Sequence, residues 1–384
     1  MNITTLKDKL SRKFRGASLD DVQGIQNYSL FGETAGNLMM RIDPMETVRH
    51  SEINIFEGIY DYASPTDLKG KKIIDIRPQV NRLTGDNSSQ TFIEDFDRDK
   101  EEQKFSVEFD EATKFIRYKN SVGNSIIINE TATTNWTAGT GVSNIAEDTI
   151  LFADGNSSLR FDASSGTNLL TWAGTAVDLS AHTQKSSFFM WVYYPDSSLI
   201  TSLKLRIGSS SSNYYEITGS IHFGSIRSGW NLHRFDWNGA TDAGTTDEAN
   251  TDYARFELTT TSADTDIRFG RLSSKLPSPH EFVYYSNAIF RPSSGSTWLT
   301  QPTADGDILN LEHDAENIYI YECCATIASD LQRYDDMTKF NRILGIRDDG
   351  SMNGEGLYGD YKKNKPSEAI RPSAQYYKIH SIRK

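Results

Sequence analysis

Residues 307–331, DILNLEHDAENIYIYECCATIASDL, carry the strongest helix pattern of the chain. Their apolar side chains recur every three to four positions in two stripes, and Asp307 can cap the amino end. Two stripes predict a helix covered on both sides, by its own domain and by a neighbour or second copy. An ordinary buried helix has the same periodicity, so core and interface both stay open. The stripes are Leu311, Ala315, Ile318, Glu322 and Ala325, and Ile320, Cys324, Ile327, Ala328 and Leu331.

The chain after this helix is polar and basic, with several glycines and two prolines. Such a segment buries too little apolar surface to order itself, but it can order on binding a partner. Tyr376 and Tyr377 are expected to anchor it. They complete the predicted oligomer or partner interface, together with Ile320, Cys324, Ile327 and Leu331.

Composition sets the broad class. The 384 residues suffice for about two or three domains with real cores. Hydrophobic residues make up 37% and charged residues 24%, which is typical of a soluble globular protein. No apolar run is long enough to cross a membrane, and the amino end lacks a signal-peptide pattern. A formal charge of -12 argues against a protein built to grip nucleic acid.

The fold class predicted from the chain as a whole is α+β. Residues 1–130 begin with helical patterns and continue with short strands, and the same composition returns after a proline-rich linker at 277–279. Between them, residues 131–277 are rich in Ser, Thr, Gly, Asn and aromatics and contain about eight short alternating strands. We therefore expect a helical and short-strand body, 1–130 plus 278–384. An antiparallel β-sandwich of the jelly-roll kind, 131–277, is inserted in it.

The sequence shows no recognisable catalytic or metal motif. Phosphate-loop, dinucleotide-loop, zinc-protease and nucleophile-elbow patterns are missing, and the histidines are scattered. Cys323 and Cys324 are adjacent on the long helix and are expected to be buried apolar groups. We predict no enzyme activity, no catalytic residue and no cofactor, although a structural Ca²⁺ is compatible with a sandwich fold.

Aromatic residues of the sandwich are the candidate ligand contacts. Trp191 and Trp230 are expected to fill the core, where aromatic side chains bury most area. Turn-like neighbours favour exposure of Trp172 and Trp237, which could then stack on a sugar ring. Core packing is the alternative for these rings as well. The predicted ligand residues are Trp172, Trp237, Tyr214 and Tyr215.

The sandwich segment resembles the carbohydrate-binding-module or galactose-binding-like jelly rolls of phage structural proteins. The resemblance covers about residues 145–275 and rests on WVYYPD, LRIGSSSSNYY and GWNLHRFDW. It implies a fold more than a ligand.

The flanking body resembles tailed-phage head–tail adaptor, or connector, proteins of the neck. The residues that carry this are FEGIYDYASPTDLKGKKIIDIRPQ, WLTQPTADGDILNLEHDAENIYIYECCATIASDLQRYDD, NRILG and LYGDYKKNKPSEA. The resemblance implies a non-catalytic virion protein of the neck that assembles in the host cytoplasm. Its implied partners are a homo-oligomeric ring of about twelve copies, the portal protein, and tail or other neck proteins. Genomic DNA would pass without sequence-specific binding, and no membrane is involved.

Two other functions stay open. One is a sugar-binding tail or capsid-decoration protein that contacts the host surface. The other is a fragment of a carbohydrate-active enzyme, because a sandwich with many Asp and Glu always offers carboxylate pairs.

Overall fold

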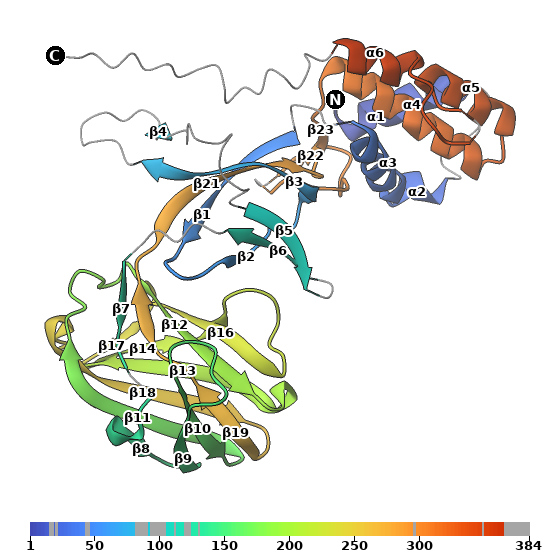
Figure 1. The fold of residues 1–384 in the computed structure, drawn as a ribbon. Helices are drawn as coiled ribbons and strands as arrows, with labels where there is room; N and C mark the ends of the chain where they lie inside the picture. The colour runs from blue at the N-terminus through green and yellow to red at the C-terminus, as the bar shows by residue number, and fades with distance from the viewer. Residues whose placement is uncertain are drawn as a thin grey trace, which may run out of the picture.

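The computed structural model describes residues 1–14, 19, 22–42, 47–80, 91–92, 105–110, 113–118, 124–129, 131–294, 297–347 and 349–364. These residues form a helical body, a middle layer of strands and a larger β-structure, which stand in a row (Figure 1). A separate hydrophobic core lies in each of them. The chain starts in the helical body, runs through the other two and returns to it.

The helical body is built around α4 (His313–Asp330), whose small and apolar residues occupy most of its circumference. Its core buries Ile318, Cys323 and Ile327 of this helix. Because an isolated helix of this length is marginal in water, packing on all sides stabilises α4 more than its own propensity does. Among the described helices, none combines the length and apolar character needed to cross a bilayer. The remaining helices are α1 (Ile3–Lys13), α2 (Gln23–Gln26), α3 (Ser29–Arg41), α5 (Tyr334–Leu344) and α6 (Gly356–Asn364).

The predicted N-cap of the long helix, Asp307, is wrong by five residues, because the N-cap position is Glu312. The helix begins at His313, and Asp307 lies in the loop before the short strand β23 (Ile308–Leu309). The buried carboxylate of Asp307 accepts hydrogen bonds from the backbone N–H groups of Ser293, Thr303 and Ala304, at 2.9, 2.7 and 3.0 Å. Asp307 therefore organises a loop, which satisfies its charge as a cap would have done.

The predicted interface stripe on this helix is also corrected. Ile320, Cys324 and Ile327 are only 5%, 0% and 0% exposed. Residues of α1, α3, α5 and α6 in the same chain surround α4, and Leu331 is half-buried against the same core. Both stripes are thus covered within one chain, and the alternative of an ordinary buried helix holds. Tyr376 and Tyr377 lie outside the described residues.

Two small antiparallel sheets form the middle layer. Their strand orders are β1-β21-β3-β4 and β2-β6-β5. β21 comes from the part of the chain that follows the sandwich, yet it lies between β1 and β3. The two chain segments that flank the sandwich therefore meet in one sheet, which brings the two ends of the intervening segment together. Phe56, Ile116 and Phe282 contribute to the core of this layer.

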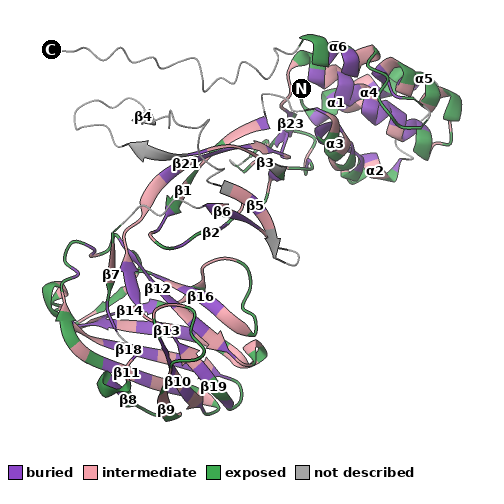
Figure 2. Cartoon of the chain, in the orientation of Figure 1, coloured by how far each residue is buried: buried purple, intermediate pink, exposed green. Residues whose placement is uncertain are grey.

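The larger β-structure is an antiparallel β-sandwich, as predicted. Its front sheet has the order β15-β16-β12-β19-β10-β9, and in addition β20 pairs with β12 and β7 pairs with β20. Its back sheet has the order β17-β14-β13-β18-β11-β8. Alternate residues of both sheets, such as Phe188 and Met190 in front and Leu203 and Leu205 behind, share one core. Figure 2 shows the alternation of buried and less buried positions along the strands. Period-2 alternation places the polar residues between them on the two outer faces.

The described strands fall into three groups. Those of the middle layer and helical body are β1 (Val48–Ile55), β2 (Asp61–Ala63), β3 (Leu68–Val80), β4 (Thr91–Phe92), β5 (Phe105–Asp110), β6 (Thr113–Tyr118), β21 (Ser278–Ser286), β22 (Phe290–Arg291) and β23 (Ile308–Leu309). Those of the front sheet are β7 (Ser125–Ile127), β9 (Val142–Asp148), β10 (Ser158–Ala163), β12 (Ser187–Tyr194), β15 (Ser220–Ile221), β16 (Gly229–Asp236), β19 (Asp264–Phe269) and β20 (Ser273–Lys275). Those of the back sheet are β8 (Trp136–Ala138), β11 (Gly166–Val177), β13 (Ile200–Gly208), β14 (Tyr214–Thr218), β17 (Thr241–Ala243) and β18 (Thr251–Thr260).

The front sheet reaches further towards the amino end than the predicted boundary at residue 131. β7 pairs with β20 through Ser125, Ile126 and Ile127. Whether 131–277, or a segment that includes β7, folds as a unit stays a prediction.

Candidate functional site

A line of residues crosses the outer face of the front sheet, one from each of five neighbouring strands. Directly opposed residues of antiparallel strands point to the same face, and strands lie about 4.8 Å apart. The line is therefore about 19 Å long. We call it the front row. In spatial order it contains Trp230 (β16), Tyr193 (β12), Arg268 (β19), Arg160 (β10) and Ala146 (β9).

The aromatic end of the front row keeps part of its surface accessible. Trp230 and Tyr193 are half-buried, and their ring centroids lie 5.5 Å apart at an interplanar angle of 65°. The Arg268 guanidinium lies 5.1 Å from the centroid of the Tyr193 ring. Aromatic contact and the cation fix the orientation of Tyr193, so these rings are pre-positioned for a ligand.

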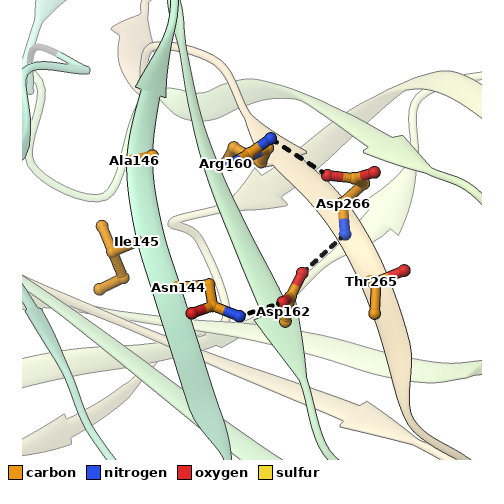
Figure 3. Close-up of a pocket in the computed structure, with 7 residues that line it drawn as sticks. All are labelled: Asn144, Ile145, Ala146, Arg160, Asp162, Thr265 and Asp266. Carbon is orange, nitrogen blue, oxygen red and sulfur yellow. Dashed lines mark hydrogen bonds and ion pairs between the residues drawn. The ribbon is translucent and has the colours of Figure 1, made fainter.

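The polar end of the front row is shaped by two β-bulges. Asn144 in β9 and Asp266 in β19 adopt φ angles of 52° and 65°, in the left-handed region that non-glycine residues rarely occupy. Register shifts accompany both residues. Asp162 lies between them and accepts hydrogen bonds from Asn144 Nδ2 at 2.6 Å and from the Asp266 backbone N–H at 3.0 Å (Figure 3). Such strain costs about 1–3 kcal/mol per residue and persists where the surroundings hold it.

These bulges border an open hollow of about 460 Å³. Its lining mixes hydrogen-bond donors and acceptors, from amide, hydroxyl, guanidinium and carboxylate groups. Asparagine and arginine side chains offer donors, and two carboxylates offer acceptors, on one surface. The lining residues are Asn144, Ile145, Ala146, Arg160, Asp162, Thr265 and Asp266.

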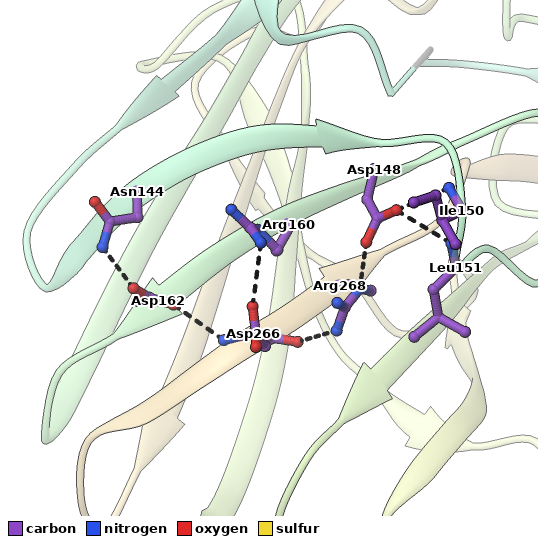
Figure 4. A network of polar contacts seen from close by, with 8 residues as sticks. All are labelled: Asn144, Asp148, Ile150, Leu151, Arg160, Asp162, Asp266 and Arg268. Atoms are coloured by element: carbon purple, nitrogen blue, oxygen red, sulfur yellow. Dashed lines mark hydrogen bonds and ion pairs between the residues drawn. The ribbon is translucent and has the colours of Figure 1, made fainter.

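The charges of the front row are balanced by carboxylates of the same face. Arg268 Nε donates to Asp148 Oδ2 at 3.0 Å, and a terminal nitrogen donates to the Asp266 carbonyl at 2.7 Å (Figure 4). Arg160 lies 3.5 Å from the Asp266 carboxylate. With Asp162, the two arginines face three carboxylates, so the surface offers no excess positive charge to a polyanion.

Asp148 also fixes the loop that follows β9. Its Oδ1 accepts hydrogen bonds from the backbone N–H groups of Ile150 at 2.8 Å and Leu151 at 3.1 Å. The Ile150 hydrogen bond, followed by those of Leu151 and Arg268, lowers the pKa of this carboxyl below its usual value. The carboxylate therefore stays ionised and holds Arg268 in the row.

The structure places the predicted ligand residues elsewhere. The prediction that Trp172 and Trp237 are exposed is wrong, because they are 3% and 2% exposed and belong to the sandwich core. Tyr215 is buried as well, and its hydroxyl donates to Glu248 at 2.5 Å. Tyr214 is half-buried on the outer face of the back sheet. These residues do not converge on one site.

Trp191 and Trp230 were predicted to fill the core, yet both are half-buried on the outer face. In SFFMWVYY both strand faces are apolar or aromatic, so alternation cannot assign Trp191 or Tyr193 to one face. A usable signal existed in GWNLHRFD, where Trp230, Leu232 and Arg234 share one parity, and the charged Arg234 marks it as outer.

Cys323 and Cys324 are both buried and unpaired, as expected. Within the part of the chain that the structure describes, no group of three or more His, Cys, Asp or Glu side chains could hold a metal ion. A structural Ca²⁺ in the sandwich stays a prediction.

No family model matches the chain, and no curated protein does. Among solved structures, the chain is similar to the family 30 carbohydrate-binding module of a cellulosomal cellulase of Clostridium thermocellum, at 10% identity and a TM-score of 0.31, over 39% of this chain and 96% of that one. It is also similar to the family 11 carbohydrate-binding module of Clostridium thermocellum, at 11% identity and a TM-score of 0.30, over 40% of this chain and 96% of that one. At such low TM-scores these matches carry no functional argument. None of them supports the resemblance to a head–tail adaptor.

Proposed function

We propose that this chain is a non-catalytic binding protein whose sandwich binds a neutral carbohydrate along the front row. The half-buried ring pair of Trp230 and Tyr193, in register with Arg268 and Arg160, carries the proposal. Sugar rings present C–H surfaces that pack on aromatic faces, and hydroxyl groups that need both donors and acceptors. Both kinds of partner occur here on one face.

The shape and charge of the face favour an oligosaccharide over other ligands. A row about 19 Å long exceeds one sugar ring, and an open hollow admits a chain that continues past either end. The balance of arginine and carboxylate disfavours nucleic acid, which needs excess positive charge. Because the bulges are held by hydrogen bonds before any ligand arrives, little ordering entropy opposes binding.

The lack of a catalytic role is part of the proposal. A glycosidase needs one carboxylic acid and one free carboxylate on either side of the scissile bond. Asp162 is the central carboxylate of the hollow, and both of its oxygens already accept hydrogen bonds within the protein. Its role as a structural acceptor supports binding without hydrolysis.

The role of head–tail adaptor, with its ring, portal partner and virion location, stays a prediction from resemblance. Its physical argument was a helix with a second apolar stripe free for a neighbour, and that stripe is covered by the chain itself. The sandwich therefore supports the alternative of a sugar-binding protein better than the adaptor. Attachment to a tail or capsid is a further part of that alternative which stays a prediction.

Affinity electrophoresis of the full chain in gels that contain neutral polysaccharides tests the proposal, followed by calorimetry with the matching oligosaccharide. We expect Trp230→Ala and Tyr193→Ala each to weaken binding about tenfold or more, the effect of losing one aromatic contact. Tyr334→Ala is the matched control, because Tyr334 is 61% exposed in the helical body. The proposal is rejected if Trp230→Ala and Tyr193→Ala bind as tightly as the control Tyr334→Ala. It is also rejected if no neutral polysaccharide retards the wild type.

A further inference from the structure

A second row of residues crosses the outer face of the back sheet, on the opposite side of the sandwich. Two tyrosines on this face are each directly opposite the same glycine of the strand between them. They are therefore about 9.6 Å apart, two strand spacings. We call this the tyrosine row. In spatial order it contains Ala243 (β17), Tyr214 (β14), Gly208 (β13), Tyr253 (β18) and Ala173 (β11).

Small residues on both sides leave the tyrosine rings accessible. Tyr214 and Tyr253 are each half-buried, and their neighbours within the row are glycine or alanine. Gly208 is required by the backbone, because a Cβ there would lie 2.2 Å from the Asn213 carbonyl oxygen and 2.6 Å from the Tyr214 Cα. The tight β13–β14 connection thus also creates the gap between the two rings.

An arginine pair lies one step along the strands from the tyrosine row. Arg206 in β13 and Arg255 in β18 are directly opposed in register, an arrangement in which like charges destabilise a sheet. Arg206 is neutralised by Glu216, with 2.7 Å between Nε and Oε2, and its guanidinium lies 4.8 Å from the Tyr214 ring centroid. For Arg255 the described residues provide no ion-pair partner, and its buried Nε has no hydrogen-bond acceptor.

The front sheet also contains a pair of directly opposed arginines, and there both charges are balanced by carboxylates. Arg160 and Arg268 are also directly opposed, but Asp266 and Asp148 lie within ion-pair distance of them. On the back sheet the corresponding acceptor for Arg255 is missing among the described residues. Arg255 is only half-buried, and its terminal nitrogens are not among the buried donors, so an anionic ligand group could bind there and offset the repulsion of the pair.

We propose that the tyrosine row and Arg255 form a second binding site, which takes an acidic sugar residue. The sugar ring packs on Tyr253, because the Arg206 guanidinium already lies over the Tyr214 ring, and the carboxylate or sulfate of the sugar accepts hydrogen bonds from the terminal nitrogens of Arg255. An acidic peptide would satisfy the arginine but would leave the paired ring surfaces unused. The site does not depend on binding at the front row, because the two rows lie on opposite faces.

Calorimetry of the full chain with oligogalacturonate tests the site, and its methyl ester is a control with the same ring but no charge. We expect the charged form to bind about tenfold or more tightly than the ester, with an affinity that falls as salt is added. A sulfated oligosaccharide shows which anionic group is preferred. Equal binding of ester and acid, or equally tight binding of oligoglutamate, would overturn the proposal.

Variants locate the site. Arg255→Gln and Tyr253→Ala should each weaken binding of oligogalacturonate about tenfold, the size expected when a charged hydrogen bond or a ring contact is lost. Lys204→Gln removes one charge from the same face two residues from Arg206, and it should change the affinity less than about threefold. If Arg255→Gln does not fold, Tyr253→Ala decides. An equal effect of Lys204→Gln would indicate general charge attraction. Loss of acid binding in Trp230→Ala would place the ligand on the front row, and either result rejects the second site.

Discussion

The rings of Phe56 and Phe189 meet edge to face, with their centroids 4.8 Å apart. Phe56 belongs to the middle layer, and Phe189 lies on the outer face of the front sheet, where Leu232 joins the same core. The middle layer thus covers one part of this face. Tyr193, four residues further along β12, lies outside that core and is half-buried. One sheet face therefore serves both to anchor the sandwich and to form the front row.

The contribution of Phe189 should depend on whether the middle layer is present. In the full chain, Phe189→Ala removes a buried ring from an interface between two bodies, and we expect a loss of about 3–5 kcal/mol in the free energy of unfolding. In a fragment of residues 124–277 the ring loses Phe56 but keeps His222, so the variant should cost clearly less than in the full chain and should increase solubility. Urea unfolding of the wild type and of Phe189→Ala, each as the full chain and as the fragment, measures the two losses of free energy.

The same fragments test the limits of the sandwich. Residues 124–277 retain β7 and should unfold in one cooperative transition, whereas residues 131–277 lack the strand that pairs with β20 and should be less stable. Absence of a cooperative transition in the longer fragment would contradict a sandwich that folds by itself. An equal loss of unfolding free energy from Phe189→Ala in the fragment and in the full chain would contradict the contact between the sandwich and the middle layer.

The sequence predicted the sandwich because its signal is local. Strict alternation in SLKLRIGS assigns Leu203, Leu205 and Ile207 to the core, and the structure buries all three. The front row is a different kind of feature, because it joins residues from β16, β12, β19, β10 and β9 that are far apart in the chain. Register and bulges bring them together, and neither can be derived from one sequence.

The long helix shows a second limit of prediction from the sequence. Two apolar stripes correctly predict a helix covered on both sides, but periodicity does not say which chain covers it. Glu322 was placed on the first apolar stripe, and the structure explains why a carboxylate is tolerated there. It is 5% exposed, pairs with Arg41, and accepts a hydrogen bond from the Tyr358 hydroxyl at 2.5 Å. Partners from α3 and α6 lie about 280 and 36 residues away in sequence.

His222, which is half-buried, and His233, which is buried, should make the stability of the chain fall in mild acid. His222 lies among the rings of Phe56, Tyr62 and Phe189, and burial, with a contribution from Arg234, lowers its pKa to about 4. Burial lowers the pKa of His233 to about 4 as well. In the unfolded chain both titrate near 6.5, so unfolding takes up protons below that pH. Their contribution is therefore complete above about pH 6.5 and is lost as the pH falls towards 4.

Melting temperatures between pH 7 and pH 4.5 measure this effect. His222→Phe keeps an aromatic ring in the cluster and removes the titrating group, so the decrease towards low pH should become smaller. His313→Gln is the control, because His313 is exposed and solvated in both states. An unchanged pH dependence in His222→Phe, or a change of the same size in His313→Gln, would show that other groups cause the acid sensitivity.

The last prediction concerns Asp162, which holds the two bulges of the front row. Asp162→Ala removes the acceptor of the Asp266 backbone N–H and of the Asn144 amide. Loss of these hydrogen bonds should lower the free energy of unfolding by about 1–3 kcal/mol. Asn144 and Asp266 then keep their unfavourable left-handed backbone without the hydrogen bonds to Asp162 that stabilise it. The hollow should therefore lose its shape. Affinity for a neutral oligosaccharide should therefore fall more than stability alone explains.

Two further variants separate the hydrogen bonds from the backbone strain. Asp162→Asn keeps an oxygen for the Asp266 N–H, so it should stay closer to wild type than Asp162→Ala in a urea titration. Asp266→Gly removes the cost of φ 65° and gives up only an exposed contact with Arg160. If Asp162 holds the strain, Asp266→Gly should recover more stability in the Asp162→Ala background than in the wild type, by about 1 kcal/mol. Additive effects in this cycle, or an Asp162→Ala variant as stable as the wild type, would mean that the bulges are set by the strands alone.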